Sequence, residues 1–436
     1  PAIFHGQFEA CDGIDNDCDD VVDEGYADYD GDGSANCVDP DDDNDGDVDT
    51  NDCQDQNAAI FNGQDEICDA IDNNCDNQID EVCAVAAGIW PMYLYDLRRT
   101  GHNMNVQGPS NNHLRWEKNT GYVVQTPVVG EDHTVYVKGG NHLYALDPTD
   151  GDTFWSVELG GGGAAPTIRK DGYLLAPAGN TLYLVNPSGQ VVDSYTFSGA
   201  VNTNATIGTD GNVYVSTSTG SYSLTPQLVL RWSFPVTNGV YDVAVGPQGR
   251  LFFSGSSHIV YAVNQDGSQD WQYSYQNADT DASCSIGETG AIYQSFGNQV
   301  VKITSTGQFE WVRNVCGDMD SHVAIFNTGY QCCNPQDFVI ANPNSNCGLW
   351  SYRYDGVQRF HVSPYSKDGS NNSTPSIDRD GDIYVGSSQN RFYSVTSSGA
   401  NRWNYHTRAD PETGSAIDEG VVYFGDDAGW LYAIGN

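Results

Sequence analysis

Short runs of alternating apolar and polar residues, separated by turn residues, dominate the chain from about residue 126 onward. The stretch Thr126–Trp155 shows the pattern most clearly, with turns at Glu131–His133, Gly139–Asn141 and Pro148–Gly151. Alternation with a period of two, between turns rich in Gly, Asp, Asn and Pro, is typical of short antiparallel strands. The stretch therefore predicts four consecutive strands.

The same unit recurs along the rest of the chain. Its copies end in aromatic residues that lie about 37 to 49 positions apart: Trp116, Trp155, Tyr195, Trp232, Trp271, Trp311, Phe360 and Trp403. The copy at Ser321–Phe360 is degenerate, and the last copy, Ser415–Ile434, stops before a fourth strand. A self-similar period of about 40 residues with four strands per unit predicts the blades of a β-propeller.

The strand missing from the last copy has a candidate at the other end of the ring. Leu114–Trp116 precedes the first full unit and resembles an isolated fourth strand. If it pairs with the last copy, the ring closes by joining its two ends and leaves no open edge there. Counted in this way, the sequence predicts an all-β fold with an eight-bladed β-propeller over residues 114–436.

The repeat TPxVxxDGxVYVGSxxxxLYALDxxTGxxxW resembles the repeats of pyrroloquinoline-quinone-type propellers. Trp90–Tyr93 and Asp96–Gly101 resemble the WPMxxxDxxxTG segment that is common just before such rings. The resemblance covers roughly residues 88–436. It implies the fold, because one fold of this kind hosts many functions, and it does not imply an activity.

The resemblance includes quinoprotein dehydrogenases, which place a vicinal disulfide against the quinone, and Cys332-Cys333 is a vicinal pair. The pair lies in the sixth blade, whereas those enzymes carry it early in the chain. The blades also lack the long insertions that build the cofactor pocket, and no Glu-Asn-Asp calcium constellation can be assigned. We therefore expect no catalytic residues and no organic cofactor, with a quinone-dependent oxidoreductase as the alternative.

Charge is distributed unevenly along the chain, whose formal net charge is −41. Residues 1–83 hold 27 of the 59 acidic residues and no Lys or Arg. Nucleic acid is excluded as a partner of this segment because both would be anionic. The segment cannot become compact against its own repulsion without counter-ions, so it either stays disordered or binds cations. No apolar run is long enough to predict a membrane span.

Two adjacent stretches of this segment, Asp28–Asp39 and Asp41–Asp52, match the pattern of a calcium loop. Such a loop supplies oxygen ligands from positions 1, 3, 5, 7, 9 and 12 and has Gly at position 6. Gly33 and Gly46 occupy position 6. Loops linked in this way resemble thrombospondin type 3 repeats, in which calcium replaces a hydrophobic core. The predicted ligands are Asp28, Asp30, Asp32, Ser34, Asn36 and Asp39 in the first loop, and Asp41, Asp43, Asp45, Asp47, Asp49 and Asp52 in the second.

A duplicated motif flanks the two loops. Pro1–Glu24 and Ala58–Glu81 align at an offset of 57 with 15 of 24 positions identical, and they resemble the CDGxDNDCDGxxDE metal-binding repeats of secreted bacterial proteins. Asp20 and Asn77 stand at position 6, where Asx residues tolerate the left-handed conformation best after Gly. The candidate ligands bring the expected number of calcium sites to about four: Asp15, Asp17, Asp19, Val21, Asp23 and Glu24, and then Asp72, Asn74, Asp76, Gln78, Asp80 and Glu81.

Twelve cysteines favour an oxidising, extracytoplasmic compartment. The spacing predicts three bridges in the acidic segment, Cys11–Cys18, Cys37–Cys53 and Cys68–Cys75. The connectivity of the propeller cysteines cannot be deduced. Our working expectation is a Cys284–Cys316 bridge, with one of Cys332 and Cys333 joined to Cys347 and the other to Cys83. Because Pro1 lacks the lead-in that precedes Ala58, we also expect a processed or partial product of a longer acidic array.

The sequence contains 26 tyrosines, several of them expected at outward strand or loop positions suited to an interface. The alternative is packing between sheets, and the residues concerned are Tyr93, Tyr95, Tyr273, Tyr275, Tyr352, Tyr354 and Tyr365.

We interpret the chain as a calcium-binding stalk without regular secondary structure (residues 1–83), a linker or lead-in segment (84–113) and a propeller (114–436). The expected function is that of a secreted, extracellular or cell-surface structural or adhesive protein. Its partners would be calcium and other extracellular proteins or copies of itself, in the second case as a self-assembling filament. A propeller scaffold for envelope protein assembly is a further alternative.

Overall fold

The computed structural model describes residues 9–17, 19–58, 60–64, 75, 90–122, 124–236, 239–255, 258–275, 282–287, 289–319, 321–327, 338–341, 347–362 and 373–435. The chain divides into two compact units, Pro1–Ala84 and Val85–Asn436. We call the first unit the acidic segment and the second the propeller. Among the residues just given, no helix is long and apolar enough to cross a membrane.

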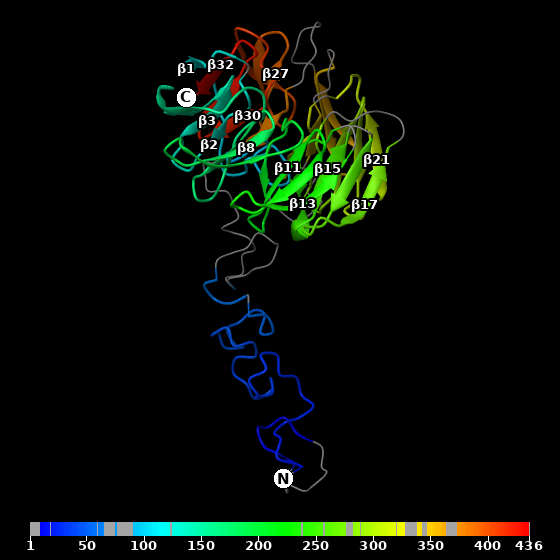
Figure 1. Cartoon of the computed structure of the whole chain (residues 1–436). Helices are drawn as coiled ribbons and strands as arrows, with labels where there is room; N and C mark the ends of the chain where they lie inside the picture. Colours follow the sequence, from blue (N-terminus) through cyan, green and yellow to red (C-terminus); the bar gives the residue numbers. More distant parts are fainter. Residues whose placement is uncertain are drawn as a thin grey trace. The chain divides into compact units, whose positions relative to one another are not determined.

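The propeller contains eight four-stranded antiparallel sheets, as predicted (Figure 1). Turns rich in Gly, Asn and Asp separate the strands and set the length of each blade. A single turn of 3-10 helix, η1 (Pro247–Gly249), lies in blade 4. The blades are blade 1, β2 (Val128–Val129), β3 (Val135–Gly139), β4 (His142–Leu146), β5 (Thr153–Glu158); blade 2, β6 (Thr167–Ile168), β7 (Leu174–Ala178), β8 (Thr181–Val185), β9 (Val191–Thr196); blade 3, β10 (Thr206–Ile207), β11 (Val213–Thr217), β12 (Gly220–Leu224), β13 (Leu230–Pro235); blade 4, β14 (Ala244–Val245), β15 (Leu251–Gly255), β16 (Ile259–Val263), β17 (Gln269–Ser274); blade 5, β18 (Ser285–Ile286), β19 (Ile292–Phe296), β20 (Gln299–Ile303), β21 (Phe309–Asn314); blade 6, β22 (Ala324–Phe326), β23 (Phe338–Ala341), β24 (Leu349–Arg353), β25 (Gln358–Val362); blade 7, β26 (Ser376–Ile377), β27 (Ile383–Ser387), β28 (Arg391–Val395), β29 (Asn401–His406); blade 8, β30 (Ser415–Asp418), β31 (Val421–Gly425), β32 (Trp430–Gly435) and β1 (Leu114–Asn119).

The ring closes as the sequence predicts. Strand β1 pairs with β32 in antiparallel fashion, with Trp116 opposite Ala433 and Asn119 opposite Trp430. Blade 8 is therefore built from both ends of the propeller, and its order is β1-β32-β31-β30. This pairing removes the free edges that an open ring would present to other strands.

The hydrophobic core lies between blades and around the axis of the ring. The apolar clusters combine residues from adjacent blades; one of them contains Val128 and Leu143 of blade 1 with Leu174 and Val185 of blade 2. The first strands of consecutive blades contact one another, as between β14 and β18 or between β26 and β30, so these strands line the axis. Each blade thus buries both faces of its sheet against its neighbours.

The fourth strand of every blade carries a β-bulge at the same place, where the register shifts by one residue. At six of the eight junctions an indole just after the bulge donates its Nε1–H to a carbonyl oxygen in the next turn, and its ring packs against that turn. The pairs are Trp116 with Pro148, Trp155 with Pro187, Trp232 with Gln265, Trp271 with Ser305, Trp311 with Tyr354, and Trp403 with Pro109, at 2.8 to 3.1 Å.

One residue of the predicted series of closing aromatics, Tyr195, does not hold the position that the series assigns to it. The register places Asp193 of blade 2 opposite Leu184, where blade 1 has Trp155 opposite Ala145. Tyr195 lies two residues further along the same strand. Spacing alone could not resolve this, because the bulge and the turn lengths absorb a shift of two residues without changing the alternation.

The turn glycines beneath the indoles predict a local stability effect. Gly307 has a φ of +79°, and a Cβ on it would lie 2.7 Å from the Trp271 ring. We expect Gly307→Ala to lower the free energy of unfolding by about 3 kcal/mol, since it combines left-handed strain with overpacking. Gly211 has a similar φ of +70° with nothing within 4 Å, so Gly211→Ala should cost only about 1 kcal/mol. Denaturant unfolding of the two variants checks this, and equal losses would contradict it.

Residues 90–107, which we call the hub segment, are part of the propeller and connect to all eight blades. Trp90 pairs with Val129 of blade 1. Backbone N–H groups of six other blades donate to carbonyl oxygens of the segment, namely those of Pro91 (blade 2), Leu97 (blade 4), Arg98 (blade 5), Thr100 (blade 6), Gly101 and Val106 (blade 7) and Gln107 (blade 8). Arg99 reaches Thr206 of blade 3 through its side chain. The sequence interpretation treated this stretch as a linker or lead-in, because polar residues such as Arg99, His102 and Asn103 gave no sign of their burial.

A buried polar network joins the hub segment to the first strands. The Arg99 guanidinium is fully buried and donates to the carbonyl oxygens of Tyr93 (2.6 Å) and Val243 (3.3 Å) and to the Thr206 hydroxyl (2.5 Å). His322 Nε2 accepts the Ser283 N–H at 3.1 Å, so the ring carries its proton on Nδ1, 3.2 Å from the Tyr93 hydroxyl. The histidine is therefore a packing residue, and its burial favours the neutral ring.

His322 predicts a loss of stability in mild acid. Burial lowers its pKa from 6.5 to about 4, so between these values the unfolded chain binds a proton that the folded chain does not. Stability is therefore present above pH 6.5 and falls as the pH drops toward 4, by a total of about 3 kcal/mol from this group. We expect His322→Gln to reduce the dependence of the unfolding free energy on pH between 7 and 4.5, and buried His102, whose pKa burial lowers to about 3, to account for part of the dependence that is left. The same change at the exposed His113 should leave the dependence as it is in the unmodified chain.

The tyrosines proposed as surface residues are packing residues where the structure describes them. Tyr95 and Tyr352 are buried. Tyr273, Tyr275 and Tyr354 pack against the apolar clusters between blades, and Tyr93 belongs to the network of the hub segment. Tyr365 lies outside the described residues. The alternation that placed these side chains outward has two buried faces in a propeller, since each sheet is covered on both sides.

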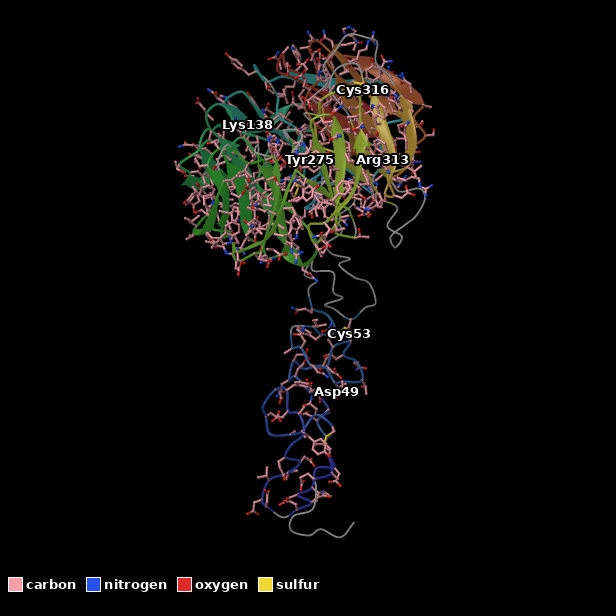
Figure 2. The ribbon with its side chains drawn as sticks, turned by 90° about the vertical axis from the view of Figure 1, so that its right-hand side faces the viewer. Asp49, Cys53, Lys138, Tyr275, Arg313 and Cys316 are labelled. Carbon is pink, nitrogen blue, oxygen red and sulfur yellow. A yellow bond between two sulfur atoms is a disulfide. The ribbon has the colours of Figure 1, made fainter. Side chains whose placement is uncertain are left out.

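The disulfide expectation for the propeller is also wrong. Cys316 bonds to Cys347 and joins blades 5 and 6 (Figure 2), whereas Cys284 is buried with a free thiol between the first strands. Burial raises the pKa of the Cys284 thiol, which therefore stays protonated. Cys83, Cys332 and Cys333 lie outside the described residues.

Candidate metal centre

The first predicted calcium loop adopts the conformation that its frame implies. Asp28 at position 1 accepts the N–H of Gly33 at position 6 (3.2 Å). Asp30 accepts the N–H of Asp32 (2.9 Å), and Asp32 accepts the N–H of Ser34 (2.8 Å). Asp28 accepts a further N–H, that of Gly31 (2.8 Å), with its other oxygen, whereas Asp30 and Asp32 each use only one oxygen in these turn bonds. Gly33 has a φ of +99°, a conformation that favours glycine.

The second loop repeats the same bonds. Asp41 accepts the N–H of Gly46 (3.1 Å), Asp43 accepts that of Asp45 (3.3 Å), and Asp45 accepts that of Asp47 (2.8 Å). Gly46 has a φ of +105°. Two loops that differ in sequence thus hold the carboxylates at positions 1, 3 and 5 in the same way.

The structure tests whether a metal ion would fit these loops. Ligand oxygens of Asp28, Asp30 and Asp32 lie within 4.8 Å of one another, and so do those of Asp41, Asp43 and Asp45. Four of these carboxylates have a buried oxygen with no hydrogen-bond donor within the described part of the chain, namely Asp30, Asp41, Asp43 and Asp45. Converging buried carboxylates without donors are costly unless a cation lies between them. The residues fit a hard cation.

Electrostatics in the second loop agree with this geometry. Burial, with the neighbouring Asp45 carboxylate, raises the pKa of Asp43 above its usual range. Burial also raises the pKa of Asp42, whose side chain accepts the Asn36 amide at 2.7 Å and so joins the two loops. A bound cation would reverse the effect on Asp43 by favouring the charged form.

The loop of the first flanking motif follows the same plan without glycine. Asp20 stands at position 6 with a φ of +73°, and its N–H donates to Asp15 at 3.0 Å. The predicted left-handed Asx residue is confirmed. Ligand oxygens of Asp15, Asp17 and Asp19 converge within 4.8 Å, and a buried oxygen of Asp17 has no donor among the described residues.

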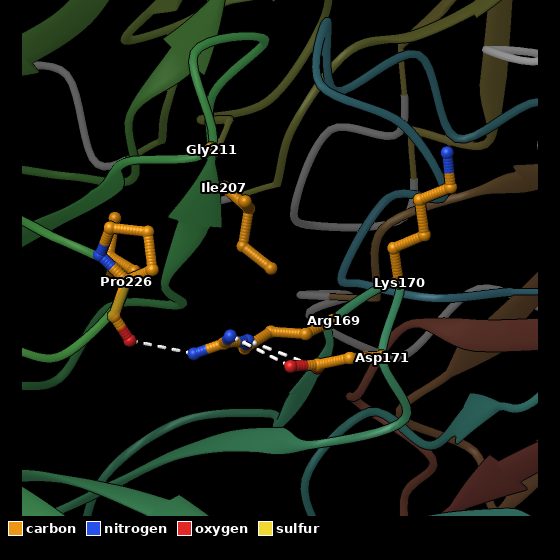
Figure 3. Close-up of a pocket in the computed structure, with 7 residues that line it drawn as sticks. Arg169, Lys170, Asp171, Ile207, Gly211 and Pro226 are labelled. Carbon is orange, nitrogen blue, oxygen red and sulfur yellow. Dashed lines mark hydrogen bonds and ion pairs between the residues drawn. The ribbon is translucent and has the colours of Figure 1, made fainter. Parts of the chain in front are cut away.

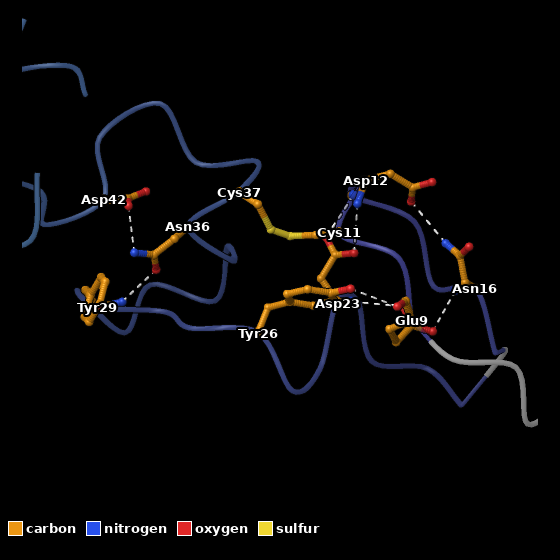
Figure 4. The surroundings of a disulfide bond; sticks show 11 residues. Glu9, Cys11, Asp12, Asn16, Asp23, Tyr26, Tyr29, Asn36, Cys37 and Asp42 are labelled. Carbon is orange, nitrogen blue, oxygen red and sulfur yellow. Dashed lines mark hydrogen bonds between the residues drawn. A yellow bond between two sulfur atoms is a disulfide. The ribbon is translucent and has the colours of Figure 1, made fainter. Parts of the chain in front are cut away.

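A second group near this loop includes a residue that sequence reasoning missed. Glu9, Asp17 and Glu24 also bring ligand oxygens within 4.8 Å of one another. Glu9 accepts the N–H groups of Asn16 and Asp17, each at 2.9 Å (Figure 4). Glu9 precedes the loop that starts at Asp15, so it has none of the numbered ligand positions of a calcium loop. The one feature of the sequence that could have indicated it is that the duplicated motif has the same residue, Glu66, at the corresponding position.

The remaining predicted ligands lie outside these four groups. Asp23 accepts the N–H groups of Asp12 and Gly13, Asn36 that of Tyr29, Asp39 that of Asp41, Asp47 that of Asn62, Asp49 that of Asp42, and Asp52 that of Gln54. The ligand roles of Ser34 and Val21, both at position 7 of their loops, stay predictions. Asp72, Asn74, Asp76, Gln78, Asp80 and Glu81 lie outside the described residues.

The disulfides of the acidic segment correct the predicted pairing. Cys11 bonds to Cys37 and Cys53 bonds to Cys75, so each bridge spans more than 20 residues (Figure 4). The predicted Cys11–Cys18, Cys37–Cys53 and Cys68–Cys75 bridges are therefore excluded, although Cys18 and Cys68 themselves lie outside the described residues. Spacing favoured the nearest partner, whereas the folded loops bring together cysteines from consecutive units. Asp52 lies beside the Cys53–Cys75 bridge, whose sulfurs are not free to bind a metal.

Comparison with known proteins gives two family matches and several similar structures. Residues 106–226 match the model of a family described as "Outer membrane protein assembly factor BamB". Residues 1–24 and 52–81 match one described as "Putative metal-binding motif", whose short name refers to copper. No curated protein matches the chain.

Three solved structures share the propeller fold at low sequence identity. BamB from Moraxella catarrhalis matches with 12% identity and a TM-score of 0.61, over 75% of this chain and 100% of its own. Quinohemoprotein alcohol dehydrogenase from Comamonas testosteroni matches with 13% identity and a TM-score of 0.62, over 81% of each chain. The computationally designed Ika8 protein matches with 8% identity and a TM-score of 0.64, over 75% and 100%. The chain therefore combines an eight-bladed propeller carrying a BamB-type repeat domain with an N-terminal metal-binding motif.

Proposed function

We propose that calcium holds the acidic segment folded outside the cell, and that the propeller is a protein-binding module. The chain would then serve as a structural or adhesive component of the cell surface or extracellular matrix. One observation carries the proposal: buried oxygens of Asp17, Asp30, Asp41, Asp43 and Asp45 converge without hydrogen-bond donors among the described residues. A protein that kept such groups without a cation would lose more in desolvation and repulsion than the short loops gain.

Calcium is favoured over other metals by the ligand chemistry. The four groups described above, each a triad of carboxylates, offer carboxylate oxygens only, which suits calcium, magnesium and manganese, whereas copper prefers imidazole and sulfur ligands. Flexible loops with many oxygens suit calcium better than magnesium, which demands a near-octahedral shell and keeps several waters. Extracellular calcium sites bind with dissociation constants of about 10⁻⁴ to 10⁻³ M, which matches the calcium level outside the cell.

The disulfides support the same compartment. Cys11–Cys37, Cys53–Cys75 and Cys316–Cys347 are bonded, and such bridges persist in oxidising environments. The two in the acidic segment cross-link its loops to one another, so the segment would keep its connectivity when the metal dissociates. Calcium would then switch the loops between stiff and loose states.

The hub segment supports a binding role for the propeller over an enzymatic one. It bonds to all eight blades, through the first strand in seven of them and through Gly420 in blade 8, so a cofactor placed at that level of the axis would have to displace it. BamB, with the same fold, is named as an assembly factor, which agrees with a propeller that acts through protein contacts. A quinone-dependent oxidoreductase remains the alternative function.

Titration calorimetry of the full chain tests the metal proposal. Calcium should bind at about four sites, with magnesium and copper at least tenfold weaker. Asp43→Asn should abolish about one site, whereas Asp55→Asn, which changes the charge equally outside the triads, should retain all of them. No calcium binding, or preferred binding of copper, would overturn the assignment of calcium. Light scattering of the same samples tests whether the chain assembles with copies of itself. If it does, we expect polymers in calcium that dissociate in chelator.

A further inference from the structure

Lysine and arginine side chains pair with carboxylates in the propeller, but the acidic segment has none. Beside a cavity of about 260 Å³ between blades 2 and 3, the Arg169 guanidinium donates to the Asp171 carboxylate at 2.8 Å and to the Pro226 carbonyl oxygen at 2.7 Å, as Figure 3 shows. Residues 1–83 contain no Lys or Arg. Asp42 is nevertheless only 8% exposed, and its Oδ1 has no hydrogen-bond donor within the described part of the chain. The burial of Asp42 therefore has a reason other than an ion pair, and the contacts of its other oxygen supply one.

The two loops that begin at Asp28 and Asp41 share a bond between positions 2 and 9. In the first loop the Tyr29 N–H donates to Asn36 Oδ1 at 3.0 Å. In the second loop the Asp42 N–H donates to Asp49 Oδ1 at 3.1 Å. The side chain at position 9 thus closes each loop in the same way, although it is an amide in one loop and a carboxylate in the other.

Asp42 joins this bond of the first loop to that of the second. Its Oδ2 accepts the Asn36 Nδ2–H at 2.7 Å (Figure 4). A continuous chain of hydrogen bonds therefore runs from the Tyr29 N–H through the Asn36 and Asp42 side chains, and from the Asp42 N–H to Asp49. Asp42 stands at position 2, which is not a ligand position of a calcium loop, so its place between the loops accounts for its burial.

The same contact explains why the two loops differ at position 9. The side chain at residue 36 accepts a hydrogen bond from Tyr29 and donates one to Asp42, and an amide can do both. An ionised carboxylate only accepts, and at residue 36 it would face the Asp42 carboxylate. Asp49 has only to accept, so a carboxylate serves there.

We propose that the two loops bind calcium cooperatively and that the hydrogen bond between Asn36 and Asp42 couples them. The inference rests on the proposed function, calcium binding by these loops, and adds how the sites are regulated. Asp41 and Asp43 flank Asp42, so an occupied second loop would hold all three residues in place. Asp42 would then fix Asn36, which closes the first loop on the Tyr29 N–H. The loop filled second needs less ordering and binds more tightly, by about 5- to 150-fold for couplings of this kind.

The test uses the Gly33 and Gly46 amides, one in each loop, as separate reporters in ¹H–¹⁵N TROSY spectra of the full chain during a calcium titration. Asp30→Asn, which inactivates the first loop, should raise the calcium midpoint of Gly46 at least about fivefold. In the presence of Asn36→Asp, the same inactivation should change that midpoint less than about twofold. The comparison removes any direct effect of Asn36→Asp on affinity, since it uses the ratio of two midpoints.

Two further variants separate the hydrogen bond from charge and from misfolding. Asn51→Asp makes the same exchange at an exposed side chain outside the ligand positions, and it should keep the fivefold effect of Asp30→Asn. The double variant Asn36→Asp/Asp42→Asn exchanges donor and acceptor at unchanged net charge, and it should restore the effect that Asn36→Asp removes.

The outcomes distinguish this inference from the proposed function. If both amides shift with calcium but Asp30→Asn leaves the Gly46 midpoint unchanged, the loops are independent and the inference is overturned, while calcium binding stands. Coupling that persists in Asn36→Asp, or that the double variant does not restore, would overturn the role of this hydrogen bond. Amides that do not respond to calcium in the natural chain would refute the proposed function and this inference with it.

Discussion

Removal of calcium is expected to expose the acidic segment to proteolysis while the propeller stays intact. The triads Asp28–Asp30–Asp32 and Asp41–Asp43–Asp45 each bring three carboxylates within 4.8 Å. Without a cation their mutual repulsion opposes the loops, and few apolar residues of the segment are buried to offset it, since Ala35 and Ile60 are the ones that the structure describes as such. We expect cleavage within residues 9–64 by an endoprotease specific for acidic residues to accelerate at least tenfold in chelator.

The matched controls lie in the same chain. Cleavage after exposed acidic residues in propeller turns, such as Asp150 and Asp266, should proceed at the same rate in calcium and in chelator, because those turns are part of hydrogen-bonded blades. Asp43→Asn should raise the cleavage rate in calcium toward the rate in chelator, whereas Asp55→Asn should not. Cleavage of the acidic segment at equal rates in both conditions would show that metal does not hold it folded.

Loss of the Arg99 side chain is expected to destabilise the propeller more than any other single change considered for it. Arg99→Leu removes two hydrogen bonds that join blades 3 and 4 to the hub segment and a third, to the Tyr93 carbonyl oxygen, within that segment. It also removes a buried positive charge that interacts with the buried Asp242 carboxylate. Loss of a buried charged donor leaves buried acceptors without their hydrogen bonds, at about 1 to 3 kcal/mol each, so we expect a total loss of about 3 to 5 kcal/mol.

Arg98→Leu is the matched control. The Arg98 side chain is 31% exposed, and its nearest carboxylate is Asp96 at 3.8 Å, so its loss should cost less than about 1 kcal/mol. Chemical denaturation followed by tryptophan fluorescence reports on the propeller, since the indoles lie at the junctions between blades. Equal midpoints for the two variants would mean that the hub segment does not hold the ring together.

Periodicity explains why the fold could be predicted so fully. Every blade repeats the same alternation and turns, so eight imperfect copies of the pattern define the strands better than a single copy would. The closure of the ring by Leu114–Asn119 could be predicted because the last copy lacks its fourth strand. The loops around Asp28 and Asp41 were predictable for a related reason. Their bonds run between residues a few positions apart, so a short frame with glycine at position 6 encodes them.

Long-range contacts could not be predicted in the same way. Arg99 reads as an ordinary polar residue of a linker, and only the closed ring shows that residues more than 100 positions away surround it. The bridges Cys11–Cys37 and Cys316–Cys347 depend on how loops stack, which spacing does not encode. Asp193 shows the same limit, because only the strand register reveals that it stands where other blades have tryptophan.

The central claim, that the Asp loops bind calcium, is tested most directly at Gly33 and Gly46. Their N–H groups donate to the position-1 carboxylates of Asp28 and Asp41, at 3.2 and 3.1 Å, so a cation at those carboxylates would polarise both bonds. ¹H–¹⁵N TROSY spectra of the full chain during a calcium titration should show both amides shifting downfield and saturating together at about one calcium per loop. Amide signals of Gly33 and Gly46 that stay unchanged up to millimolar calcium would contradict the account.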